Sequence, residues 1–154
     1  MTVVEILVAT AIATVVFVSV LGGTIFILQQ AKTQEQRGKA LALAQEGLEA
    51  VRSFRDATDW NEDGIGTKNT GVSFMLLESG SPARWELVQG TESIDEYTRE
   101  IIFEQVRRDG GGNIVEEGGA VDEETKKARV RVFWDSRGAT YEVEVASLFA
   151  NWRQ

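Results

Sequence analysis

The chain of 154 residues contains no cysteine and no histidine. Without cysteine it has no disulfide framework, no thiolate nucleophile and no thiolate metal site. Without histidine it lacks the usual general base and the commonest metal ligand of proteins. A net charge of −8 argues against a broad nucleic-acid-binding surface, so we expect no nucleic acid partner. No enzyme signature stands in the remaining residues, and we expect neither catalysis nor a bound organic cofactor.

The first 28 residues differ from the rest of the chain, because Glu5 is their only charged side chain. A helix needs about 20 apolar residues to cross the hydrocarbon core of a bilayer, and this segment exceeds that length. A cleavable secretory signal would begin with basic residues, whereas this segment has a carboxylate near its start. We therefore expect that a basic leader preceded Met1 and was removed.

The carboxylate of Glu5 needs a partner that neutralises its charge. An ionised carboxylate in a membrane-spanning helix costs about 2.5–3.5 kcal/mol on insertion scales. The segment contains no Lys or Arg, so the α-amine of Met1 is the only cation at that depth. Within one chain, Glu5 would reach this amine or cap the first N–H groups of the helix. Between chains, Glu5 would neutralise the Met1 amine of a neighbouring subunit and so fix the axial register of the two. The residues leave both alternatives open.

The opening "MTVVEILVA" resembles the mature N-terminus of type IV pilins and pseudopilins. In that family a prepilin peptidase cuts after a glycine, the new first residue is N-methylated, and the fifth residue is Glu. The resemblance implies that Met1 is methylated and that Met1 and Glu5 set the register between subunits. Two further stretches, "ALAQEGLEAVRSFRD" and "LFANWRQ", resemble a PilV-like subgroup of prepilin-type proteins.

One position departs from the family pattern. Many members carry a proline where the helix melts inside the filament, and this chain has Gly22 and Gly23 there. Each glycine weakens a helix by about 1 kcal/mol relative to alanine, so the pair could allow the same local melting. The alternative is a close contact between helices through small residues.

Residues 29–56 are expected to continue the helix in polar form. Apolar residues recur there at helical spacing and predict a stripe on one face: Leu41, Ala44, Leu48, Val51 and Phe54. The predicted organisation is an apolar membrane or filament-core helix at 1–28, an amphipathic continuation at 29–56, and a globular sheet domain at 57–154.

The last part of the chain changes to a period of two, which predicts strands. The candidate strands are 72–77, 84–88, 97–108 and a hairpin at 128–149, whose turn is Ser136-Arg137 or Arg137-Gly138. In the hairpin, Val130 and Val132 point to one face, while the Arg and Glu residues share the other. Residues 110–113 and 116–124 predict an exposed acidic loop. The fold class is therefore α+β: an antiparallel sheet packed on the second half of a long helix.

One segment has the residue pattern of a calcium site. Asp59, Asn61 and Asp63, followed by Gly64, match the start of an EF-hand loop. The acid required at the twelfth position is missing, because Thr70 stands there, so a substitute such as Glu62 or Asp122 would be needed. The alternative, which we favour, is an ordinary Asx-rich turn.

Together these features predict a structural subunit of a type IV pilus-like surface filament. It would sit in the cytoplasmic membrane before assembly and then form a helical homo-oligomer outside the cell. The resemblance implies a prepilin peptidase, an assembly ATPase and a platform protein as partners. The alternatives are a type II secretion-type pseudopilin or minor pilin, and a membrane-anchored extracellular binding domain.

Overall fold

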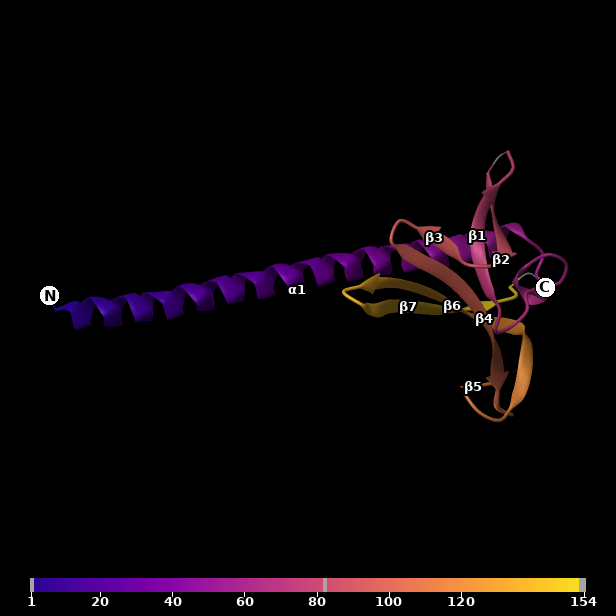
Figure 1. The fold of residues 1–154 in the computed structure, drawn as a ribbon. Helices are drawn as coiled ribbons and strands as arrows, with labels where there is room; N and C mark the ends of the chain where they lie inside the picture. The colour runs from indigo at the N-terminus through magenta and orange to yellow at the C-terminus, as the bar shows by residue number, and fades with distance from the viewer. Residues whose placement is uncertain (1, 82, 153–154) are drawn as a thin grey trace. The chain divides into compact units, whose positions relative to one another are not determined.

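The computed structural model describes residues 2–81 and 83–152. Its elements, shown in Figure 1, are helix α1 (Val3–Ala57), 3-10 helix η1 (Ile65–Thr67) and strands β1 (Ser73–Ser79), β2 (Arg84–Gln89), β3 (Glu92–Ile94), β4 (Tyr97–Arg108), β5 (Ile114–Val115), β6 (Ala120–Ser136) and β7 (Ala139–Ala150). The chain falls into two compact units that divide between Gly38 and Lys39, and each is described by itself. The predicted α+β class is confirmed, since a long N-terminal helix packs on an antiparallel sheet.

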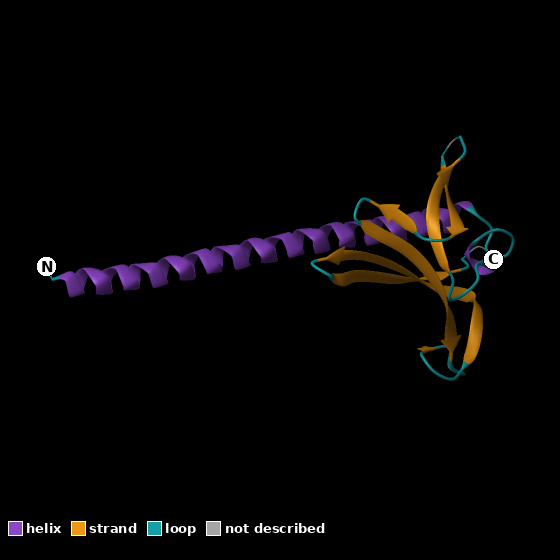
Figure 2. Cartoon of the chain, viewed as in Figure 1, coloured by secondary structure: helices purple, strands orange, loops and turns teal. Residues whose placement is uncertain are grey.

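The sheet has the strand order β2-β1-β4-β6-β7, with β3 and β5 also paired to β4. Figure 2 shows these strands joined by loops and turns. The turn between β6 and β7 is Arg137-Gly138, the second of the two predicted, and both residues have positive φ, +53° and +77°. This is the backbone conformation of the two-residue turns that match the twist of antiparallel strands.

The two faces of the sheet differ in polarity as predicted. The inner face, which packs against residues 39–57 of α1, buries Val130, Val132 and Trp134 of β6 completely or nearly so. The same face of β7 carries Tyr141, Val143 and Val145, which pack at the edge of this core. The outer face carries the Arg and Glu residues of the hairpin. The alternation along β6 and β7 therefore places most of their large apolar side chains on the inner face, whereas Phe133 and Leu148, which is 48% exposed, lie on the outer face.

The predicted apolar stripe on the helix is only partly correct. Leu41 is 43% exposed and Leu48 is half-buried, although Ala44, Val51 and Phe54 are buried as expected. The buried face of α1 is made largely of small residues: Ala40, Ala44, Gly47, Ala50, Val51 and Phe54. Small side chains allow the helix backbone to lie close to the sheet. The side of α1 that carries these small residues is therefore the buried one, although Leu41 and Leu48 are larger and more apolar.

A buried arginine of the sheet contacts the helix backbone. Arg99 of β4 is 2% exposed, and its Nη1 donates a hydrogen bond to the carbonyl oxygen of Leu43 at 3.0 Å. Its Nε and Nη2 donate to Oε2 of Glu92 on β3 at 3.0 and 2.7 Å. A Cβ atom on Gly47 would lie 3.0 Å from Cγ1 of Val130 and 3.2 Å from Cδ of Arg99. Gly47 therefore leaves the space that the Arg99 side chain occupies beneath α1.

The predicted loop at 116–124 is wrong in its second half. β6 begins at Ala120, and Ala120–Asp122 pair with β4 up to a register shift at Gln105/Val106. In Figure 1 this part of β4 and β6 forms a separate arm with β5. At this shift some residues of β6 have no partner on β4. One of them, Glu123, accepts a hydrogen bond at its carbonyl oxygen from the indole N–H of Trp60 at 3.2 Å. A β-bulge of this kind bends the strand pair. The acidic composition of this segment predicted a loop, so the strand at Ala120–Asp122 was not expected.

An ion pair holds the arm together. Nε of Arg108 donates to Oδ2 of Asp122 at 2.6 Å, and the N–H of Glu124 donates to Oδ1 at 3.0 Å. The hydrogen bond from Arg108 is the main cause that holds the pKa of Asp122 below the usual 3.8, with a further contribution from Thr125. The charged form of Asp122 is thus favoured in the folded chain.

We predict that Gly47→Leu lowers the free energy of unfolding by about 1–3 kcal/mol, because the new side chain overlaps Arg99 and Val130. The matched control is Gly38→Leu, since nothing lies within 4 Å of a Cβ at Gly38. That change removes a helical glycine and should leave stability equal or raise it by up to about 1 kcal/mol. Thermal unfolding of the full chain in detergent, followed by near-ultraviolet circular dichroism, measures both. Equal effects at the two sites would contradict the close approach at Gly47.

We predict that Asp122→Asn destabilises the chain at neutral pH and that the difference disappears in acid. A carboxyl whose pKa is lowered on folding stabilises the fold above its unfolded pKa, and this contribution is lost as the pH falls through the folded pKa. The melting temperatures of the variant and the wild type should therefore converge well below pH 3.8. Glu117→Gln, in the exposed loop before β6, makes the same change in net charge and should show no such convergence. A difference that is constant with pH would argue against the Arg108–Asp122 pair.

Candidate functional site

The first half of α1 is an apolar helix whose side chains face outward. Its most apolar window of 18 residues has a mean hydropathy of 2.5, and none of that window is buried. Large apolar side chains along it are 50–76% exposed, for example Val3, Leu7, Phe17 and Phe26. By length and composition this helix could cross a membrane. Among the described residues nothing covers it.

The few hydroxyl groups of this segment are satisfied by the helix itself. The hydroxyls of Thr14, Ser19 and Thr24 each donate to the carbonyl oxygen four residues earlier, at 2.8–2.9 Å. The hydroxyl of Thr10 likewise lies 3.0 Å from the carbonyl oxygen of Ile6. A helix in lipid or among apolar helices must satisfy its polar groups internally. The hydroxyls of this segment therefore add no polar group that needs water.

Glu5 makes a local contact with Thr2. The backbone N–H of Thr2 donates to Oε2 of Glu5 at 3.4 Å, and the backbone N–H of Glu5 donates to Oγ1 of Thr2 at 3.4 Å. This reciprocal pair is a capping box, in which each side chain satisfies the amide of the other residue. Its sequence signature, Thr-x-x-Glu at 2–5, was available, and Thr2 is the residue that the sequence reasoning missed.

The cap corresponds to the intrachain alternative for Glu5 and leaves the register between subunits a prediction. Both contacts are at 3.4 Å, near the long end of the range for hydrogen bonds. Met1 lies outside the described residues. It is the second residue of the predicted register pair and the site of the predicted methylation.

Gly22 and Gly23 lie within continuous helix. α1 runs through both, and no atom lies within 4 Å of a Cβ built at either position. They therefore present a strip of bare backbone on the exposed segment. Local melting and close contact between helices both stay predictions, since each concerns a neighbouring chain.

The acidic loop at 59–64 uses its side chains on its own backbone. Oδ1 of Asp63 accepts the N–H of Asp59 at 3.1 Å, and Oδ1 of Asp59 accepts the N–H of Asn61 at 2.9 Å. The N–H of Gly64 donates to the carbonyl oxygen of Asp59 at 2.6 Å. Trp60, between them, is buried. These are the contacts of an Asx turn anchored by a core tryptophan.

The substitutes considered for the missing calcium ligand lie in other contacts or on the surface. Asp122 is paired with Arg108, and Glu62 is exposed. Within residues 2–81 and 83–152, no three or more Asp, Glu, His or Cys side chains form a group that could hold a metal ion. Calcium binding by Asp59, Asn61 and Asp63 stays a hypothesis, and the geometry favours the turn.

Comparison of the chain with protein-family models, with curated proteins and with solved structures finds no match. The long apolar N-terminal helix and the antiparallel sheet are compatible with a pilin-like fold. Its function is therefore inferred from its own residues.

We predict that Asp63→Ala lowers the melting temperature by the same amount with and without millimolar Ca²⁺, because the carboxylate serves the turn. Asn61→Ala is the control, because its side chain would also be a calcium ligand while the turn uses its backbone N–H. It should therefore have a smaller effect in either condition. A rise in the melting temperature with Ca²⁺ that both variants abolish would instead establish the calcium site.

Proposed function

We propose that the protein is a structural subunit of a type IV pilus-like filament, held in a membrane through the first half of α1 before assembly. The observation that carries this proposal is the exposed apolar helix with a single carboxylate at its start. A helix of this kind is not stable in water, so it needs lipid or other apolar helices around it. Copies of the same segment supply such surroundings in a bundle.

Two features support a bundle over lipid alone as the final environment. Gly22 and Gly23 expose backbone that a neighbouring helix could approach closely. Glu5 places a carboxylate where the terminal amine of a neighbour would neutralise it, and its local contacts at 3.4 Å would be exchanged for that charge pair on assembly. The sheet unit would then lie on the outside of the bundle.

The segment supports two other functions. A type II secretion-type pseudopilin would share the processed end and the helix but form short filaments or none. A membrane-anchored extracellular binding domain would need only a helix that crosses the bilayer, and the capping box at Thr2 and Glu5 suits an anchor equally well. Mass spectrometry of the N-terminal peptide separates the anchor from the other two, because only they predict N-methyl-Met1.

We predict that Glu5→Ala yields stable, membrane-held protein that forms few or no filaments, measured by electron microscopy of sheared surface material. Removing the carboxylate also removes the capping box, so the matched control is Thr2→Val. That change removes only the capping hydroxyl of Thr2 and leaves the charge of Glu5. The control should assemble normally or nearly so. Normal filaments from Glu5→Ala would refute the register role, and equal loss in both variants would assign Glu5 to the cap.

A further inference from the structure

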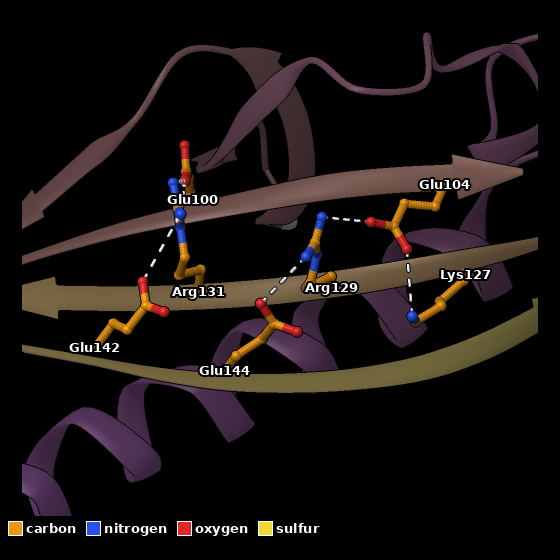
Figure 3. Close-up of polar contacts among 7 residues, drawn as sticks. All are labelled: Glu100, Glu104, Lys127, Arg129, Arg131, Glu142 and Glu144. Carbon is orange, nitrogen blue, oxygen red and sulfur yellow. Dashed lines mark hydrogen bonds and ion pairs between the residues drawn. The ribbon is translucent and has the colours of Figure 1, made fainter.

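Charged side chains on the outer face of the sheet form alternating columns across three strands. Figure 3 shows these residues, which we call the charge ladder: Glu100 and Glu104 of β4, Lys127, Arg129 and Arg131 of β6, and Glu142 and Glu144 of β7. Acidic β4 is followed by basic β6 and then by acidic β7. The order of charges follows the order of strands, and the ladder ends on an acidic strand.

The basic column is engaged mainly with β4. Nε of Arg131 donates to Oε1 of Glu100 at 2.7 Å, and Arg129 pairs with Glu104. On the other side, Arg129 and Arg131 lie 3.4 and 3.7 Å from Glu144 and Glu142.

The acidic columns also differ in exposure. The side chains of Glu142 and Glu144 are 61% and 40% exposed, against 6% for Glu100 and 33% for Glu104, which already pairs with both Lys127 and Arg129. The β7 carboxylates therefore retain capacity for another basic partner.

β7 also forms an open edge of the sheet. It has 12 residues, and in the described chain the strand order ends with it. The opposite edge strand, β2, has six residues. Natural proteins protect long edges with proline, charged side chains or bulges; β7 contains no proline, pairs with β6 without a register shift, and carries charges of one sign, Glu142 and Glu144. Its free edge is thus suited to accept another strand.

The backbone groups that face this edge follow from the turn. In a two-residue hairpin the closing pair, here Ser136 and Ala139, is hydrogen-bonded, so the odd-numbered residues of β7 face β6. The N–H of Asn151, also odd-numbered, accordingly donates to the carbonyl oxygen of Glu124 at 2.8 Å. The outward N–H and C=O groups belong to the even-numbered residues Thr140, Glu142, Glu144, Ala146, Leu148 and Ala150.

We propose that the edge of β7 binds an extended segment of another protein that carries basic residues on one face and small apolar residues on the other. Its basic side chains would lie beside Glu142 and Glu144, and its apolar side chains would cover Val143 and Val145, which are half-buried. β6, the strand on the other side of β7, has this composition in Lys127–Val132. The proposal does not depend on the filament.

A second copy of this chain is a poorer occupant. Pairing two β7 strands edge to edge in antiparallel register places Glu142 and Glu144 of both copies on the same outer face. Like charges on neighbouring strands destabilise the pairing, and the Arg residues of each copy are already engaged with β4. The alternation of the ladder instead calls for a basic strand.

The experiment uses the full chain in detergent and a labelled peptide with the sequence of residues 127–133, KARVRVF, as the probe. Fluorescence anisotropy should show binding at least about tenfold tighter than for the matched peptide EAEVEVF. Hydrogen exchange should show new protection at the even-numbered amides of β7 and not at the odd-numbered ones. The double variant Glu142→Lys/Glu144→Lys should reverse the preference between the two peptides.

A backbone variant tests the edge itself. Ala146→Pro removes an outward N–H and leaves the bonds to β6, whereas Ala146→Val keeps the N–H. Proline should weaken binding of KARVRVF by about tenfold or more, and valine should not. The proposal is overturned if neither peptide binds, if both bind equally, or if binding leaves the β7 amides unprotected. Protection of the even-numbered amides that grows with protein concentration without peptide would identify a second copy as the occupant instead.

Discussion

The unit that begins at Lys39 depends on the close approach of α1 to the sheet. Ala40, Ala44 and Gly47 have side chains too small to hold the helix away, and Arg99 occupies the space next to Gly47. A buried guanidinium is stable only with its partners, which here are the carbonyl oxygen of Leu43 and the carboxylates of Glu92 and Glu46. This set joins α1, β3 and β4 at one point and fixes how the helix lies on the inner face.

The first half of α1 has the opposite character, because its apolar side chains have no cover among the described residues. Two devices make such a segment compatible with apolar surroundings. The hydroxyls of Thr14, Ser19 and Thr24 return to the helix backbone, and Glu5 shares a capping box with Thr2. One half of the helix is thus specified for contact within its own chain and the other for contact outside it. The proposed filament and the membrane are two ways to meet that requirement.

Much of this fold was accessible from the sequence, since the apolar run, the helical spacing after it and the period-two strands are local patterns. The hairpin of β6 and β7 follows from alternation and from one glycine at the turn. The buried face of α1 was accessible only in part: helical spacing predicted Ala44, Val51 and Phe54, but it favoured Leu41 and Leu48 where close packing buries Ala40 and Gly47. The strand at Ala120–Asp122 was hidden by its acidic composition, and only its pairing with β4 across a bulge makes it a strand.

The candidate functional site was likewise predictable from the sequence only in part. The apolar segment and Glu5 could be recognised because a single charge in a long apolar run is conspicuous. Thr2 was missed, although its spacing to Glu5 is that of a capping box. The Asx turn at 59–64 resembled a calcium loop because both use Asp and Asn at alternate positions. The difference lies in the buried Trp60 and in where the carboxylates point, and neither can be read from composition.

The open edge of β7 has a consequence for the colloidal behaviour of the protein. An uncovered strand of 12 residues invites edge-to-edge pairing, and the net charge of −8 at neutral pH opposes such contact between the sheets of neighbouring molecules. That repulsion weakens as the pH falls toward the isoelectric point of about 4.7, so the edges of neighbouring molecules would meet more readily there. The pH of a detergent solution therefore controls how readily this chain associates through the edge of β7.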